Sequence, residues 1–241
     1  MKRKIQFLVF ISGSVLLFFL FQYQFSINNT WDSWSLPLSG KIIIVDPGHG
    51  YPDPGAGPEG AFEKDIAFNI SLLLRDYLQE AGALVIMTRE DDFDLADKGL
   101  KGYSKRKTQD LIRRVELINK SEGDLLISVH LNSLPSSRWS GAQTFYYPRF
   151  EENKLLAKMI QKEMEANLEN TVRHAKAINH VYVLKEAEMP SVLVEAGFLS
   201  NPGEREQLKS KAYQDKIAAS IYQGILRLYT ENPKHKEPSP E

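Results

Sequence analysis

The chain contains no cysteine among its 241 residues. Disulfide bonds, thiolate metal sites and a catalytic cysteine are therefore excluded, and any metal must be held by histidines and carboxylates. The sequence also lacks an excess of positive charge. Its 30 basic residues are matched by 31 acidic ones, and three of the basic residues lie within the first four positions. This balance argues against nucleic acid as the partner.

Two common catalytic motifs are also missing. The run Gly48-His49-Gly50 has neither the spacing of a dinucleotide-binding loop nor the lysine of a P-loop. No Gly-x-Ser-x-Gly nucleophile elbow is present. The apolar content of 42% and the charged content of 25% are typical of a globular protein.

The longest apolar run lies at the N-terminus. Three basic residues precede the uncharged stretch Ile5–Gln22, which is nearly long enough to cross a hydrocarbon core of roughly 30 Å. The positive-inside rule then places residues 27–241 outside the cytoplasmic membrane. Because Phe21–Phe25 is bulky and shows no small-residue cleavage site, we expect an uncleaved signal anchor at residues 1–26. A cleaved signal peptide, which would make the protein secreted, is the alternative.

The rest of the chain alternates short apolar runs with amphipathic segments. This pattern predicts a single three-layer α/β domain over residues 41–231, with a mostly parallel twisted sheet of about six strands and helices on both faces. We expect a polar tether at 27–40 before the domain and a disordered tail at 232–241 after it. The expected strands are 42–45, 84–88, 125–129, 142–147, 181–184 and 191–194, and the expected helices are 64–81, 104–121, 151–168 and 213–229.

Three of the expected strands are followed by residues that can carry chemistry, namely His49, His130 and Glu195. If these strands are parallel, the three side chains lie along one edge of the sheet, where neighbouring strands are about 4.8 Å apart. Two imidazoles at that distance can share a metal ion. Glu63, which opens the first helix of the domain, is the first candidate for a third ligand, and Glu59 is the second.

Two histidines and one carboxylate leave a fourth coordination position open, as in catalytic zinc sites, where bound water has a pKa of about 7. Glu195 can then act as the general base. Each residue also has a plainer interpretation. Glu195 can cap a helix or pair with an arginine, and Glu63 can be an ordinary acid in a first helical turn. Asn132 can orient a metal ligand or simply form a turn.

The other histidines are weaker candidates. His174 and His180 lie in a polar stretch, where we expect surface or substrate-cleft positions, although one of them could replace a ligand named above. His235 lies in the tail and is set aside.

Four motifs, taken together, resemble the zinc-dependent N-acetylmuramoyl-L-alanine amidases of the amidase-3 type over residues 41–230. The motifs are Asp46-Pro47-Gly48-His49-Gly50, Glu63-Lys64, Ser128-Val129-His130-Leu131-Asn132 and Pro190-Ser191-Val192-Leu193-Val194-Glu195-Ala196-Gly197-Phe198-Leu199-Ser200-Asn201. The resemblance implies Zn²⁺ on His49, Glu63 and His130, with Glu195 as the catalytic glutamate. The pair Thr88-Arg89 also matches, which makes Arg89 a candidate cleft residue. Tyr51 stands where the family usually has a second glycine, and we expect it to shape the cleft entrance.

The resemblance implies a hydrolase that cleaves the amide between N-acetylmuramic acid and the L-alanine of the stem peptide in peptidoglycan. With its short chain, its N-terminal anchor and its lack of wall-binding repeats, the sequence is most similar to the sporulation members of the family. This similarity implies a role in forming muramic δ-lactam in the spore cortex and in germination. The catalytic domain would then lie on the cell-wall side of a membrane or between the forespore membranes. An open three-ligand site also allows for an accessory protein that helps to hold the zinc. The alternatives are a zinc carboxypeptidase or deacetylase on the same polymer, or a wall-binding protein without catalytic activity.

Overall fold

The computed structural model describes residues 2–27 and 36–231 and divides the chain into two units, Met1–Leu36 and Pro37–Glu241. In the first unit, Lys2–Ile27 forms helix α1. Among the residues that the structure describes, no helix is both long and apolar enough to cross a membrane, so the transmembrane segment predicted at 1–26 is not supported. Most of the predicted tether and all of the predicted disordered tail lie outside the described residues.

The second unit is built around a six-stranded sheet with the order β2-β1-β3-β6-β4-β5. All neighbouring strands are parallel except β4 and β6, which are antiparallel. The predicted α/β architecture with a mostly parallel sheet is therefore confirmed. The strands are β1 (Ile42–Pro47), β2 (Leu84–Met87), β3 (Leu125–Asn132), β4 (Gln143–Tyr146), β5 (Lys176–Ala177) and β6 (Ser191–Phe198).

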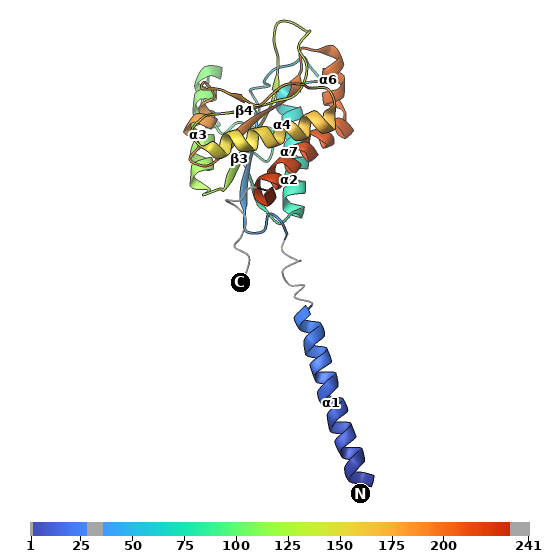
Figure 1. The fold of residues 1–241 in the computed structure, drawn as a ribbon. Coiled ribbons are helices and arrows are strands. Elements are labelled where there is room, and N and C mark those ends of the chain that lie inside the picture. Colours follow the sequence, from blue (N-terminus) through green and yellow to red (C-terminus); the bar gives the residue numbers. More distant parts are fainter. Residues whose placement is uncertain (1, 28–35, 232–241) are drawn as a thin grey trace. The chain divides into compact units, whose positions relative to one another are not determined.

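Helices cover both faces of this sheet. Helices α2, α4 and α7 pack together over one face, where they bury the larger apolar core, and Figure 1 shows them on the same side. Helices α3 and α5 cover a smaller apolar cluster on the other face. The helices of this unit are α2 (Glu63–Glu80), α3 (Tyr103–Lys120), α4 (Glu151–Leu168), α5 (Tyr182–Glu186), α6 (Pro202–Lys209) and α7 (Lys211–Glu231).

Two predicted elements need correction. The strand predicted at 181–184 is wrong, because these residues contribute to the short helix α5, and the sixth strand is instead Lys176–Ala177. A four-residue apolar run is too short for its periodicity to separate a helix from a strand. Helix α6 was not predicted, although its start carries a recognisable signal. The Asn201 side chain accepts a hydrogen bond from the Glu204 backbone N–H at 3.1 Å, and Pro202 follows it directly.

Candidate metal centre

The carboxyl ends of the two central strands β1 and β3 bring three candidate ligands together. His49 follows β1, His130 lies on β3, and Glu63 is the first residue of α2. One ligand atom from each residue lies within 4.8 Å of the others. Glu63 Oε2 is 3.0 Å from His49 Nε2, and Glu63 Oε1 is 2.8 Å from His130 Nδ1. The two rings meet edge to face with their centroids 5.0 Å apart.

Backbone groups hold the Glu63 carboxylate in place between the two rings. The N–H of Ala56 donates to Oε2 at 2.9 Å, and the N–H of Leu131 donates to Oε1 at 3.0 Å. Burial alone would raise the pKa of Glu63, but the two histidines outweigh it and hold the pKa well below its usual range. Glu63 is therefore an ionised carboxylate in a fixed position, which suits a metal ligand.

Two glycines allow this close approach. A Cβ atom on Gly48 would overlap the ring of His130, and one on Gly55 would lie 2.7 Å from Glu63 Oε2. Gly55 also has a φ of 68°, in the left-handed region that favours glycine. His49 itself has a φ of 62°, a conformation that is uncommon for a residue other than glycine and that commonly marks functional sites.

Glu195 is placed next to this group by the sheet register. It is the partner of His130 across β3 and β6, so both side chains lie on the same face of the sheet. Its Oε2 atom is buried and has no hydrogen-bond partner among the residues that the structure describes. Burial raises the pKa of Glu195 to about 7. The positive charge of His130 lowers this pKa and the negative charge of Glu63 raises it, but burial has the largest effect. A buried carboxyl with this pKa has the properties of a general acid–base group.

A buried ion pair between Arg114 of α3 and Asp46 holds the carboxyl end of β1 in place. Arg114 of α3 donates to Asp46 Oδ1 at 2.7 Å, to the Pro47 carbonyl at 2.8 Å and to the His49 carbonyl at 2.5 Å. The hydroxyls of Thr88 and Ser128 also donate to Asp46, at 2.6 and 2.7 Å. Burial would raise the pKa of Asp46, but Arg114 and the two hydroxyls outweigh it and lower the pKa to about 2.

The remaining sequence candidates lie outside the group of three ligands. Arg89 is buried and donates to the carbonyls of Gly48 and Lys64 at 3.0 and 2.8 Å, which places it in the support of the turn after β1. The Tyr51 side chain is exposed, and Asn132 lies at the end of β3. Glu59, His174 and His180 are exposed and are not among the three grouped ligands, and His235 lies outside the described residues.

Sequence reasoning missed Asp53, which lies four residues after His49. Its Oδ2 atom is 2.8 Å from His49 Nδ1, the ring nitrogen that faces away from Glu63. Burial lowers the pKa of His49, but the hydrogen bonds to Asp53 and Glu63 outweigh it and raise the pKa to about 8. A metal-binding histidine commonly donates its other ring N–H to a carboxylate. The sequence signal for this contact was the position of Asp53, only four residues after His49.

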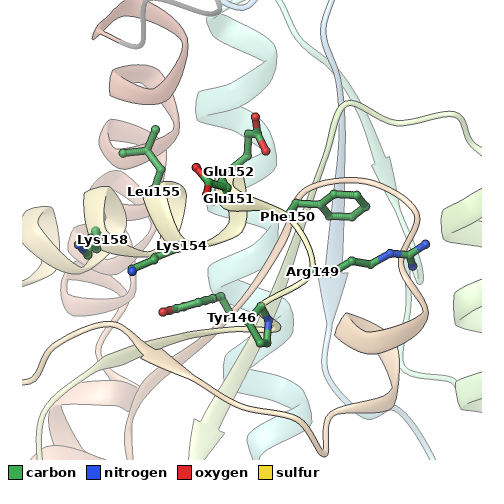
Figure 2. A pocket seen from close by; sticks show the side chains of 9 residues that line it. Tyr146, Arg149, Phe150, Glu151, Glu152, Lys154, Leu155 and Lys158 are labelled. Atoms are coloured by element: carbon green, nitrogen blue, oxygen red, sulfur yellow. The ribbon is translucent and has the colours of Figure 1, made fainter.

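A surface pocket lies away from this centre. It has a volume of about 660 Å³ and is formed by the segment after β4 and the first turns of α4 (Figure 2). Gln143 of β4 pairs with Glu195, and Phe145 pairs with Leu193. The chain therefore runs away from the sheet edge that carries the candidate ligands before it reaches Tyr146 at the pocket. The pocket therefore belongs to the opposite end of these strands.

The residues fit a divalent metal ion. The donor set of two imidazoles and one carboxylate is one that zinc binds in catalytic sites, with a coordination position left open. The ligand atoms already converge, and the ionised Glu63 supplies the negative charge. The buried and unpartnered Oε2 of Glu195 is a further polar atom for which the fold itself offers no partner among the described residues. The site can therefore hold a metal and place a general base beside it.

Comparison with known proteins agrees with this geometry. Residues 43–227 match the Amidase_3 family model, described as N-acetylmuramoyl-L-alanine amidase. The germination-specific N-acetylmuramoyl-L-alanine amidase of Bacillus subtilis is 56% identical over 231 residues, which are 96% of this chain and 98% of that protein. The N-acetylmuramoyl-L-alanine amidase LytC of the same organism is 34% identical over 80% of this chain and 36% of its own length.

Two solved structures share the fold. The CwlD amidase from Clostridioides difficile, solved in complex with the GerS lipoprotein, has a TM-score of 0.78 and 40% identity over 80% of this chain and 100% of that chain. An N-acetylmuramoyl-L-alanine amidase from Clostridium difficile 630 has a TM-score of 0.70 and 29% identity, over 80% of this chain and 98% of that one. The chain belongs to the N-acetylmuramoyl-L-alanine amidase family.

Proposed function

We propose that this protein is a zinc-dependent amidase of the germination-specific kind. It hydrolyses the amide bond between the lactyl group of N-acetylmuramic acid and the L-alanine of the stem peptide. The observation that carries the proposal is the convergence of His49, Glu63 and His130 beside Glu195 in a chain of this family. Peptidoglycan lies outside the cytoplasmic membrane, so the protein acts on that side.

The ligand residues have a clear division of labour in this proposal. His49 and His130 would hold the ion through Nε2 and Nδ1, and Glu63 through its carboxylate. When bound, zinc supplies a Lewis acid that polarises the amide carbonyl and makes water more acidic. Backbone donors keep Glu63 in position, and Asp53 keeps the His49 ring in its orientation.

Glu195 moves the proton. Its carboxylate accepts a proton from the attacking water and returns it to the nitrogen of L-alanine as the amine leaves, so one residue serves as base and then as acid. The raised pKa of Glu195 supports this, because a group with a pKa near 7 both accepts and releases protons at neutral pH.

The biological setting is proposed from the relatives. The Bacillus subtilis relative is a germination-specific amidase, so we place the substrate of this protein in the spore cortex. There we expect the removal of the stem peptide to precede the formation of muramic δ-lactam. The Clostridioides difficile relative was solved with a lipoprotein, so we also propose an accessory protein partner for this chain.

Metal content tests the first part of the proposal. The full-length protein is expected to bind one Zn²⁺, and His49→Ala is expected to weaken binding by more than about 100-fold, because even an outer partner of a ligand is worth 10–100-fold. Metal stoichiometry and a competing chelator measure both values. Glu59→Gln is the matched control, because Glu59 is an exposed acid of the same loop and should bind zinc as the native protein does. Native protein that binds no zinc would overturn the proposal.

A further inference from the structure

Asp53 occupies an unusual position for a loop carboxylate. Its side chain is buried, and both of its oxygens are fully engaged. Oδ2 lies 2.8 Å from His49 Nδ1 and 2.5 Å from Lys107 Nζ. Oδ1 accepts from the Tyr103 hydroxyl at 2.7 Å and from the Gly55 N–H at 3.0 Å. The loop after β1 is thereby joined to the first turns of α3, fifty residues further along the chain.

The contact with His49 determines which nitrogen of the ring can bind a metal. A carboxylate at Nδ1 keeps the proton on that nitrogen and leaves the lone pair on Nε2. Nε2 is the nitrogen that lies 3.0 Å from Glu63, on the side where the three ligand atoms converge. Asp53 therefore presents His49 in the tautomer and orientation that the metal centre needs. The negative charge of Asp53 also makes Nε2 a stronger electron-pair donor to a metal.

Lys107 acts on the same oxygen with the opposite charge. Its Nζ atom shares Oδ2 with His49 and lies 3.3 Å from Nδ1. An ammonium group on that oxygen draws electron density away from the Asp53–His49 contact, and its charge repels a cation at Nε2 across the ring. Tyr103 is neutral and lies on the other oxygen, so it holds Asp53 in place without this electrostatic cost.

We propose that Asp53 is a positioning residue that strengthens metal binding through His49, and that Lys107 weakens the same binding by sharing the Asp53 carboxylate. The proposal rests on the zinc site proposed above. In this proposal, two side chains outside the ligand set adjust the metal affinity in opposite directions. One lies on the loop after β1 and the other on α3. Lys107 has the role of a tuning residue, and Tyr103 that of a support.

The test measures the affinity of the full-length apoprotein for Zn²⁺ alone, by competition with a chromophoric chelator at constant pH. Asp53→Asn is expected to weaken binding by about 10–100-fold. Lys107→Met removes the charge but keeps the length of the side chain, and it is expected to tighten binding by roughly tenfold, since it removes a positive charge close to the ion. Lys105→Met, the matched control on an exposed lysine of the same helix, is expected to change affinity by less than about threefold.

The opposite signs separate this proposal from a purely structural role. If the Asp53–Lys107 ion pair only fastened the loop to α3, both substitutions would weaken zinc binding, and that result would overturn the proposal. The absorption spectrum of the Co²⁺-substituted protein gives a second readout. Asp53→Asn should change this spectrum, and Lys107→Met should leave it close to that of the native protein. The thermal midpoint of each apoprotein shows whether the variant is folded, and Lys107→Met still tests the sign if Asp53→Asn does not fold.

Failure of the inference can be told apart from failure of the proposed function. Native protein that binds zinc, together with a Lys107→Met variant of unchanged or weaker affinity, would contradict the inference alone. Native protein that binds no zinc would contradict both.

Discussion

Glu195→Gln is expected to reduce kcat for stem-peptide release by about 10²–10⁴-fold, the usual contribution of a general acid–base group. Glutamine keeps the size of the side chain but cannot take the proton of the attacking water. The carboxyl oxygen Oε2 is buried without a partner among the described residues, so its replacement by an amide breaks no hydrogen bond seen there. Zinc content and the free energy of unfolding should therefore stay close to those of the native protein.

The measurement compares the rate of peptide release from purified cortex peptidoglycan with the zinc content of the same sample. Glu188→Gln is the control, because Glu188 is an exposed acid shortly before the same strand and should leave the rate unchanged. Because the base acts as a carboxylate, kcat/KM of the native enzyme should fall as the pH falls below the pKa of Glu195. A zinc-loaded Glu195→Gln variant with near-native kcat would show that another group carries the proton.

Arg114→Met is expected to lower the free energy of unfolding by about 3–5 kcal/mol, the usual cost of removing one partner of a buried ion pair. Arg114 is 2% exposed, and its removal leaves Asp46 buried with only the hydroxyls of Thr88 and Ser128 as partners. Urea unfolding at pH 7 measures the loss. Arg113→Met is the matched control on the preceding residue of α3. Arg113 pairs with Asp97 near the surface, so its loss should cost less than about 1 kcal/mol.

The same comparison has a predicted pH dependence. The pKa of Asp46 is lowered to about 2 in the folded protein, so the stability that this carboxylate contributes is fully present above its unfolded pKa of about 3.9. It is lost as the pH falls from about 4 towards 2. Without Arg114, burial should instead raise the pKa of Asp46. Protonation of Asp46 should then remove the cost of burying an unpaired charge in the variant. The difference between native and variant should therefore shrink over that pH range, and a constant difference would contradict the assigned ion pair.

The sheet could be predicted from the sequence because its central strands are continuous apolar runs. The segments Ile42–Val45, Leu125–Val129 and Ser191–Val194 are followed by His49, His130 and Glu195, and parallel pairing then brings those residues to one edge. His49, His130 and Glu195 followed from this rule, whereas Glu63 was the first of two candidates for a third ligand because it opens the first helix. The structure brings one ligand atom each of His49, Glu63 and His130 together.

The supporting contacts could not be predicted in the same way. Lys107 lies 58 residues from His49 in the sequence, and its approach depends on how α3 packs on the loop after β1. Arg114 did carry a signal, because it shares a helix face with Leu111 and Ile118, where a charged residue implies a buried partner. Its partner Asp46 follows an apolar strand, but no local pattern pairs the two residues.

The most direct test of the central claim is the mass of the products that the zinc-loaded, full-length protein releases from purified cortex peptidoglycan. We expect free stem peptides that begin with L-alanine, and glycan strands whose muramic acid carries a free lactyl carboxyl group. Removal of only the terminal amino acid of the stem, or of acetate from the glycan, with every stem peptide still attached, would rule out the proposed amidase activity and indicate a carboxypeptidase or a deacetylase.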